Sequence, residues 1–176
     1  GLEAYCFAWK DGAICSEYAD GFYDISIVEK EAILEKCQEL KIDGIATIAS
    51  DTATVAVNYV ASKMGLVANP NDYTAVCTNK YLMRQCFMNH QVPSPKFAVA
   101  DEKGADLQGF HYPLIVKPTD RSGSRGVEKI NSSEELSSAI ERAQNESFEH
   151  KAIVEEFVTG REISVESISY RGTHYI

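Results

Sequence analysis

Apolar positions along the first half of the chain form two kinds of pattern, and their order predicts an α/β arrangement. Continuous apolar runs at Leu2–Trp9, Tyr23–Ile27 and Gly44–Ile48 predict buried strands. Apolar residues at helical spacing predict helices over Val28–Leu40 and Ala53–Met64. A strand, a helix and a further strand make the parallel crossover unit. We therefore expect a parallel sheet in this half of the chain.

The loop Ala49–Asp51 follows the last of these predicted strands. Ligand sites in open parallel sheets form at the carboxyl ends of strands, so this loop is a candidate position for one. Asp51 also directly precedes a helical pattern, where an aspartate commonly accepts hydrogen bonds from the first free N–H groups. We interpret Asp51 as a helix N-cap in preference to a ligand.

The pattern changes after a helix predicted at Thr78–His90. The segment Val92–Pro95 contains two prolines, and a proline disfavours helix in the residue before it. We place a domain junction there, which divides the chain into residues 1–93 and 94–176. The second part combines one helical pattern with several strand-like runs, which predict a helix at Asn131–Ala143 and strands at Phe97–Ala100, Leu114–Val116, Val127–Ile130, Ala152–Val158 and Glu162–Tyr170.

The segment Tyr112–Val127, with the sequence YPLIVKPTDRSGSRGV, is the strongest candidate for chemistry. It is typical of a strand, a polar loop and a second strand. Gly123 and Gly126 allow positive φ and a close approach of backbone to ligand, and consecutive N–H groups can form an anion-binding concavity. Three basic residues stand against the single Asp120, namely Lys117, Arg121 and Arg125. In a chain of net charge −9 this local basicity favours a phosphate-bearing ligand, with a solvated β-hairpin turn as the alternative.

Composition limits what that ligand can be. The 176 residues, 44% hydrophobic and 24% charged, can bury a core. A pI near 4.9 and the lack of a Lys/Arg cluster argue against nucleic acid or an anionic membrane as partner. No apolar run approaches the roughly 18 residues that cross a bilayer. We therefore expect a small phosphate-bearing ligand.

The cysteines give an expectation about redox environment. Five cysteines without a CxxC pair argue against a disulfide framework or a zinc site. Cys6, Cys37 and Cys86 lie in apolar patterns and are interpreted as buried thiols. The four histidines share no metal-ligand spacing. A reducing, cytoplasmic location and no metal site within the chain follow as predictions.

Four segments, taken in order and spacing, resemble the ATP-grasp superfamily, and most closely its carbamoyl-phosphate-synthetase-like branch. They are TNKYLMR at Thr78–Arg84, VPSPKF at Val92–Phe97, PLIVKPTDRSGSRGV at Pro113–Val127 and IVEEFVTGREISVE at Ile153–Glu166. The resemblance implies a Rossmann-like parallel-sheet pre-ATP-grasp domain over residues 1–93, without its first strand and helix. A partial ATP-grasp domain, the first α+β lobe in truncated form, would follow over residues 94–176.

The resemblance also assigns roles to residues. Lys80 and Lys117 match the two lysines that reach the nucleotide phosphates, and an ammonium group is a compact charge suited to a phosphate oxygen. Glu162 matches the acidic residue that accepts hydrogen bonds from the ribose hydroxyls. The flap over the phosphates would comprise Ser122, Gly123, Ser124, Arg125, Gly126 and Val127. The adenine would lie along Glu155, Glu156, Phe157 and Val158, with Glu155 on the exocyclic amine, backbone groups of Glu156 and Val158 on the ring edge, and Phe157 in the ring-sized slot.

Each assignment has a plainer alternative. Lys80 alone would be a solvated surface lysine. Glu155 and Glu156 could be a charge pair that protects an edge strand from aggregation. Glu162 could face solvent on an alternating strand. Arg84 is interpreted as an ion-pair partner on a helix surface, and Trp9 as a core or interface aromatic residue.

By resemblance, the parent protein is an ATP-dependent ligase, either a carboxylate–amine ligase or a carbamoyl-phosphate-type synthetase. Such enzymes activate a carboxylate as an acylphosphate for attack by an amine or other nucleophile. The partners implied are ATP, Mg²⁺ and a small carboxylate, with a homodimer among the assemblies to expect. The magnesium ligands, the catalytic arginine and the acceptor pocket are expected outside this chain. No catalytic or metal-binding residue is therefore predicted within it.

The chain is accordingly expected to be an internal fragment that binds ATP without ligase turnover. The alternative from another class is a non-catalytic nucleotide-binding or interaction module with the same fold. A dinucleotide-binding oxidoreductase is disfavoured, because no GxGxxG motif follows a predicted strand.

Overall fold

The computed structural model describes residues 1–176 except 49, 102 and 103, and has the mixed α/β arrangement expected from the sequence. The N-terminal unit contains the strands β1 (Tyr5–Ala8) and β2 (Gly21–Asp24), which pair in parallel. The short 3-10 helix η1 (Ile14–Glu17) connects them. The helices α1 (Lys30–Leu40) and α2 (Asp51–Met64) complete the unit. Its core is made of side chains from these two helices, Ile33, Cys37, Ala56 and Val60.

The predicted strand Gly44–Ile48 does not form. Of this segment only Ile45 packs against the N-terminal core, and the side chain of Ile48 is 93% exposed. The predicted strand, helix and strand of the crossover unit are therefore wrong in their last member. The parallel pairing itself is present in β1 and β2.

The start of α2 also differs from the prediction. Ser50 is the N-cap, and its hydroxyl accepts a hydrogen bond of 3.3 Å from the N–H of Ala53. Asp51 is instead the first helical residue, where its charge favours the positive end of the helix dipole. The other end agrees with the prediction, since Gly65 ends the helix in the left-handed conformation. Ala49, in the predicted ligand loop, lies outside the described residues.

Two cysteines of this unit form a disulfide, which the sequence analysis argued against. Cys6 in β1 bonds to Cys15 in η1, and their Cα atoms are 6.5 Å apart. The turn between β1 and η1 brings the two residues together, so the interpretation of Cys6 as a buried thiol is wrong. Cys37 is a buried free thiol, and Cys77 is an exposed one.

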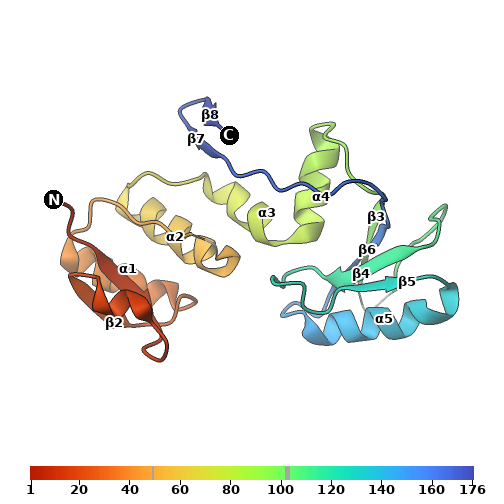
Figure 1. Ribbon diagram of the computed structural model, residues 1–176, viewed down its shortest axis with the longest axis horizontal. Helices are drawn as coiled ribbons and strands as arrows, with labels where there is room; N and C mark the ends of the chain where they lie inside the picture. The colour runs from red at the N-terminus through yellow and green to blue at the C-terminus, as the bar shows by residue number, and fades with distance from the viewer. Residues whose placement is uncertain (49, 102–103) are drawn as a thin grey trace.

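Short helices connect the N-terminal unit to a sheet. These are η2 (Asn71–Tyr73), α3 (Thr74–Thr78) and α4 (Lys80–Asn89), which lie between the two ends of the molecule (Figure 1). The buried Asn79 caps α4, because its side-chain oxygen accepts hydrogen bonds from the N–H groups of Tyr81 and Leu82. The predicted helix Thr78–His90 is therefore confirmed, with a cap that fixes where it begins.

The sheet contains β3 (Phe97–Ala100), β4 (Leu114–Pro118), β5 (Glu128–Ile130) and β6 (Ala152–Glu156). Its order is β3-β6-β4-β5, and every neighbouring pair is antiparallel. The helix α5 (Ser133–Glu146) covers one face (Figure 1). Alternate strand residues point to that face and form the core of this lobe with α5, namely Ala100, Leu114, Val116, Ile130, Ala139, Ala143, Ala152 and Val154.

The C-terminal segment forms a small hairpin of β7 (Ile168–Tyr170) and β8 (Thr173–Tyr175). The predicted strand Glu162–Tyr170 is therefore wrong over its first part. Its alternating apolar side chains, such as Ile163 and Val165, are 76% and 60% exposed and have no sheet to pack on. Among the helices that the structure describes, none combines the length and apolar character needed to span a membrane.

Candidate functional site

A buried carboxylate lies at the centre of the sheet face opposite α5. Glu155, on β6, is only 3% exposed. Lys117, on β4, donates a 2.6 Å hydrogen bond to its Oε2 atom. Arg84, on α4, donates from Nε to Oε1 over 2.6 Å and from the guanidinium to Oε2 over 3.4 Å. Both oxygens of the carboxylate are thus engaged by cations from other elements.

The register of the sheet explains this grouping. Glu155 lies opposite Ile115 on β4 and opposite Phe97 on β3. Because successive strand residues alternate between faces, Lys117 projects to the same side as Ile115, while Val116 projects into the core. Strand β6 lies between β3 and β4. The carboxylate therefore sits in the middle of the sheet, where its charge requires partners.

Those partners decide the charge state of Glu155. Burial raises the pKa of its carboxyl group, but the hydrogen bonds from Arg84 and Lys117 outweigh burial. The pKa lies below its ordinary value of 4.5 as a result, and the group is ionised at neutral pH. The cluster carries two positive charges against one negative charge and remains attractive to an anion.

Lys80, the second lysine predicted to reach the phosphates, lies at the carboxyl end of β4, the strand that carries Lys117. Lys80 begins α4, its N–H donates to the carbonyl oxygen of Thr119 over 2.8 Å, and its ammonium group donates to the carbonyl oxygen of Arg121. Burial lowers the pKa of Lys80, and the nearby charge of Lys117 lowers it further. Two residues 37 positions apart in the printed numbering are thereby brought to one place.

The predicted flap connects β4 to β5 and is exposed over its whole length, 122–127. Gly123, Ser124 and Gly126 all have positive φ, of 67°, 57° and 66°. Gly126 packs closely at the base of the loop, since a Cβ there would lie 2.9 Å from Cγ of Pro118. Around Gly123 nothing lies within 4 Å of such a Cβ. The loop is thus anchored at one end and open in its middle.

The predicted adenine segment follows Glu155 at the end of β6. The N–H of Glu156 donates to Lys96 over 3.0 Å, and the N–H of Phe157 donates to Pro113 over 3.0 Å. Val158 is 66% exposed, and its N–H has no hydrogen-bond partner within the described part of the chain. An edge-recognition role for the Val158 backbone is therefore sterically open, and it stays a prediction.

Other members of the predicted set are placed less tightly. The ring of Phe157 is 37% exposed, and the ammonium group of Lys129 lies 3.7 Å from its centroid. Glu162 lies in the exposed irregular segment before β7, away from any described partner. The predicted contact of Glu155 with an exocyclic amine competes with two cations that already occupy its oxygens. These three roles are not tested by the structure.

Arg84 is a member of this charged cluster that the sequence did not assign to the site. It forms an ion pair, as expected, but with a buried carboxylate 71 positions away instead of a neighbour on the helix surface. A signal was available, because Arg84 follows Lys80 by four residues and thus lies on the same helix face. Its partner, Glu155, could not be identified from the sequence because the pairing depends on the order of the strands in the sheet.

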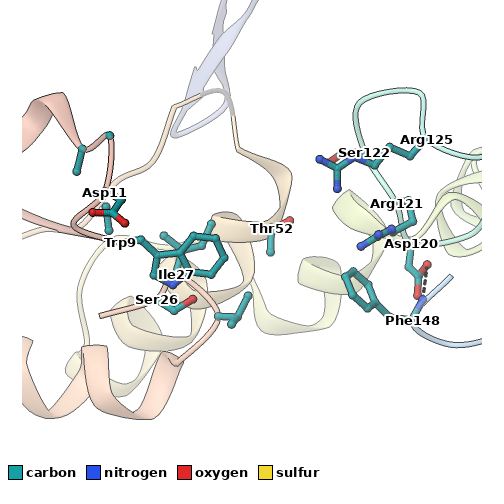
Figure 2. Close-up of a pocket in the computed structure, with 14 residues that line it drawn as sticks. Trp9, Asp11, Ser26, Ile27, Thr52, Asp120, Arg121, Ser122, Arg125 and Phe148 are labelled. Atoms are coloured by element: carbon teal, nitrogen blue, oxygen red, sulfur yellow. Dashed lines mark hydrogen bonds between the residues drawn. The ribbon is translucent and has the colours of Figure 1, made fainter. Parts of the chain in front are cut away.

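A cleft of about 480 Å³ adjoins this site, between the N-terminal unit and the root of the flap (Figure 2). Trp9, Ile27 and Thr52 lie on one side, and Arg121 and Arg125 lie on the other. The side chain of Trp9 is 72% exposed, so of the two alternatives for this residue the core is excluded and the interface stays a prediction. No group of three or more His, Cys, Asp or Glu residues in the described ranges is arranged to hold a metal ion.

Comparisons with known proteins agree on one kind of fold. The family model for the D-ala D-ala ligase C-terminus matches residues 88–173. A D-alanine–D-alanine ligase from Enterococcus faecalis is 32% identical over 146 residues, which are 79% of this chain and 40% of that protein. The vancomycin/teicoplanin A-type resistance protein VanA from Enterococcus faecium is 34% identical over 91 residues, 51% of this chain and 26% of its own length. The chain thus spans less than half of these relatives.

Solved structures extend the likeness to nearly the whole chain. An L-amino acid ligase from Bacillus licheniformis matches 99% of this chain and 43% of its own, with a TM-score of 0.78 and 21% identity. A phosphoribosylglycinamide synthetase from Anaerococcus prevotii matches 91% of this chain and 40% of its own, with a TM-score of 0.64 and 25% identity. The first likeness shows the fold alone. None of these matches singles out a carbamoyl-phosphate-synthetase-like branch, which stays a prediction.

Proposed function

The chain belongs to the ATP-grasp superfamily, and from that premise we propose that it is the nucleotide-binding part of an ATP-dependent ligase. In the parent protein, ATP would convert a carboxylate into an acylphosphate, which an amine or other nucleophile then attacks. The observation that carries the proposal is the position of Lys80 and Lys117 beside an exposed glycine loop. The cytoplasm as location, magnesium as metal and a homodimer as assembly are parts of the same proposal.

The charges of the site suit a triphosphate. Lys117 is held in place by the buried carboxylate of Glu155 over 2.6 Å, so its position does not depend on the ligand. Lys80 is partly buried, which lowers its pKa, and an ammonium group in such a place binds an anion more strongly than one in water. A prearranged pair of cations contributes to catalysis because it is already oriented when negative charge develops on the phosphate.

The loop 122–127 supplies the second requirement, which is closure. Three residues with positive φ turn successive N–H groups in ways that allow an anion-binding concavity. Because Gly126 is packed and Gly123 is open, the loop can bend about a fixed base. Folding over the phosphates would exclude water from the reacting groups, which strengthens every electrostatic contact there.

The test is calorimetric titration of Mg-ATP into the chain. Lys117→Gln is the informative variant, because glutamine keeps a donor for Glu155 and lacks the charge. A lost charged hydrogen bond of about 1.5–3 kcal/mol weakens binding by about 10- to 100-fold. Lys63→Gln, an exposed lysine of α2 in the N-terminal unit, is the matched control and should bind like the wild type.

Each outcome has a definite meaning. Saturable binding by wild type and Lys63→Gln, with weakened binding by Lys117→Gln, supports the assignment. Equal affinity in all three proteins would show that nucleotide binds elsewhere. Absence of saturable binding by the wild type would reject ATP binding by this chain. It would then favour the non-catalytic interaction module, which the same titration on the longer parent protein would examine.

A further inference from the structure

Two cysteines, Cys6 and Cys15, close a short loop in the N-terminal unit. Cys6 lies in β1, which pairs with β2, and Cys15 lies in η1, nine positions further along the chain. The disulfide between them therefore encloses the whole turn that connects the strand to the 3-10 helix. The three other cysteines, Cys37, Cys77 and Cys86, are free thiols.

The enclosed turn forms part of one wall of the cleft. Figure 2 shows Trp9 and Asp11 on this wall, opposite Arg121 and Arg125 at the root of the flap. The position of the turn therefore shapes the side of the cleft that faces the flap. The residues between the two cysteines that line the cleft are Ala8, Trp9, Asp11, Gly12 and Ala13.

Packing does little to hold this turn in place. All of residues 9–17 are described and none of them is buried, and the side chains of Trp9 and Ile14 are each 72% exposed. The N–H of Lys10 donates to Oδ1 of Asp24 over 3.1 Å, while the other described hydrogen bonds of residues 10–14 stay within residues 10–17. Segments with few buried contacts open locally at a low cost in free energy. The disulfide is therefore the main constraint on the turn.

The two sulfurs lie where a small thiol can reach them. Both cysteines are half-buried, and Cys15 stands between the exposed residues Ile14 and Ser16. Exchange requires only that a thiolate approach one sulfur of the bond. In a reducing compartment, such as the cytoplasm of the proposed function, a disulfide that does form is typically transient and redox-sensing.

We propose that Cys6 and Cys15 form a redox-responsive clasp, which fixes this wall of the cleft when bonded and releases it when reduced. The co-reactant is a small thiol such as glutathione. Its thiolate attacks one sulfur and forms a mixed disulfide, and the other cysteine leaves as a thiolate and takes up a proton. A second glutathione thiolate then displaces the remaining cysteine, which is also protonated.

The exchange is balanced in atoms and electrons. Two glutathione thiols lose their protons and two electrons, the two cysteines gain them, and one molecule of oxidised glutathione is formed. Oxidised glutathione closes the clasp by the same steps in reverse. The clasp itself does not depend on nucleotide binding, whereas an effect on ligase turnover in the parent protein would rest on the proposed function.

The test combines thiol labelling with limited proteolysis of the native chain, without nucleotide. The chain is equilibrated in buffers that range from mostly oxidised to mostly reduced glutathione, and labelling by iodoacetamide reports the state of Cys6 and Cys15. Trypsin cleaves after Lys10, which lies inside the enclosed turn. We expect both cysteines to become labelled together in the reduced buffers. Cleavage at Lys10 should be at least about tenfold faster there, because the disulfide no longer restricts the opening of the turn.

A reference site and two variants locate the effect. Cleavage after Arg171, in the exposed turn between β7 and β8, should proceed equally in all buffers and reports the activity of trypsin itself. Cys15→Ser removes the bond at a position in η1, which contains no buried residue, and should be cleaved rapidly at Lys10 in every buffer. Cys77→Ser removes an exposed free thiol and should respond like the wild type.

Several outcomes would overturn the proposal. A pair that stays bonded in the reduced buffers would be a static structural disulfide, and a pair that never bonds in the oxidised buffers would not be a clasp. Equal cleavage at Lys10 in both states would show that the bond does not control the turn. A redox response in Cys15→Ser, or its loss in Cys77→Ser, would assign the effect to another cysteine. Because no nucleotide is present, these results are independent of the Mg-ATP titration.

Discussion

Replacing Glu155 by glutamine tests whether the buried cluster stabilises the fold as its geometry indicates. The substitution keeps the size of the side chain and removes its negative charge. Lys117 and Arg84 would then keep their positive charges beside a neutral amide, with side chains that are only 15% and 21% exposed. The substitution therefore destabilises the folded chain through electrostatic repulsion and not through a steric clash.

The magnitude follows from this burial. Removing one member of a buried ion pair typically costs about 3–5 kcal/mol, because the remaining charge is left uncompensated. Both cations retain some contact with solvent, so we expect the lower end, about 3 kcal/mol of unfolding free energy. For a protein of this size that corresponds to a fall in Tm of about 6–12 °C.

The loss should also depend on pH in a defined direction. The pKa of Glu155 is lower in the folded chain than its ordinary value of 4.5, so its charge stabilises the folded state above that value. The contribution is lost as pH falls through the depressed folded pKa. The difference in stability between wild type and Glu155→Gln should therefore be full at pH 7 and shrink in the acid range below 4.5.

Urea unfolding followed by circular dichroism at several pH values measures both effects. Glu156→Gln is the matched control, since the neighbouring side chain is 29% exposed and, among the described residues, pairs only with the exposed His111. It should change stability by less than about 0.5 kcal/mol. A Glu155→Gln protein as stable as this control at pH 7, or a difference that grows as pH falls, would refute the reasoning.

Three further changes have outcomes that the structure specifies. Gly126→Ala should destabilise the chain more than Gly123→Ala, because both have positive φ but only the former would place a Cβ 2.9 Å from a proline ring, and thermal denaturation compares them. Asn79→Ala should lower the unfolding free energy by about 1 kcal/mol or more, through loss of the α4 cap, measured by urea titration; no change would contradict the cap. In the native chain an alkylating reagent should label the exposed Cys77 rapidly and Cys37 only on unfolding, since burial excludes the reagent and raises the pKa of the Cys37 thiol. Mass spectrometry of timed samples measures the labelling, and Cys37 labelled before Cys77 would contradict the prediction.

The sequence predicted the sheet lobe well where local patterns decide the structure. Phe97–Ala100 was placed correctly as β3, and the apolar run Leu114–Val116 was placed correctly within β4. The two lysines predicted to reach phosphates and the glycine loop were grouped by motif, and the structure brings Lys80 to the end of β4 beside Arg121. Signals of this kind are contained within a few residues of chain.

The predictions that failed concern segments whose structure depends on the conformation or contacts of other parts of the chain. Ser50 and Asp51 are both good capping residues, and only the geometry of the chain entering α2 selects the first. The alternating pattern after Glu162 is a sound strand signal, but hydrogen bonding needs a neighbour that the described chain does not provide there. The partner of Arg84 depends on β6 lying between β3 and β4, which no local pattern states.

That strand order has a consequence for how the protein is made. Strand β6 emerges from the ribosome after β3 and β4 but pairs with both, so neither can complete its hydrogen bonding until Ala152–Glu156 has been synthesised. At about 5–20 residues per second, the chain from β3 to β6 spends several seconds with unpaired strand edges. The same few residues bring Glu155 to its cations. The sheet and the candidate site are therefore completed by the same strand, once β6 has been synthesised.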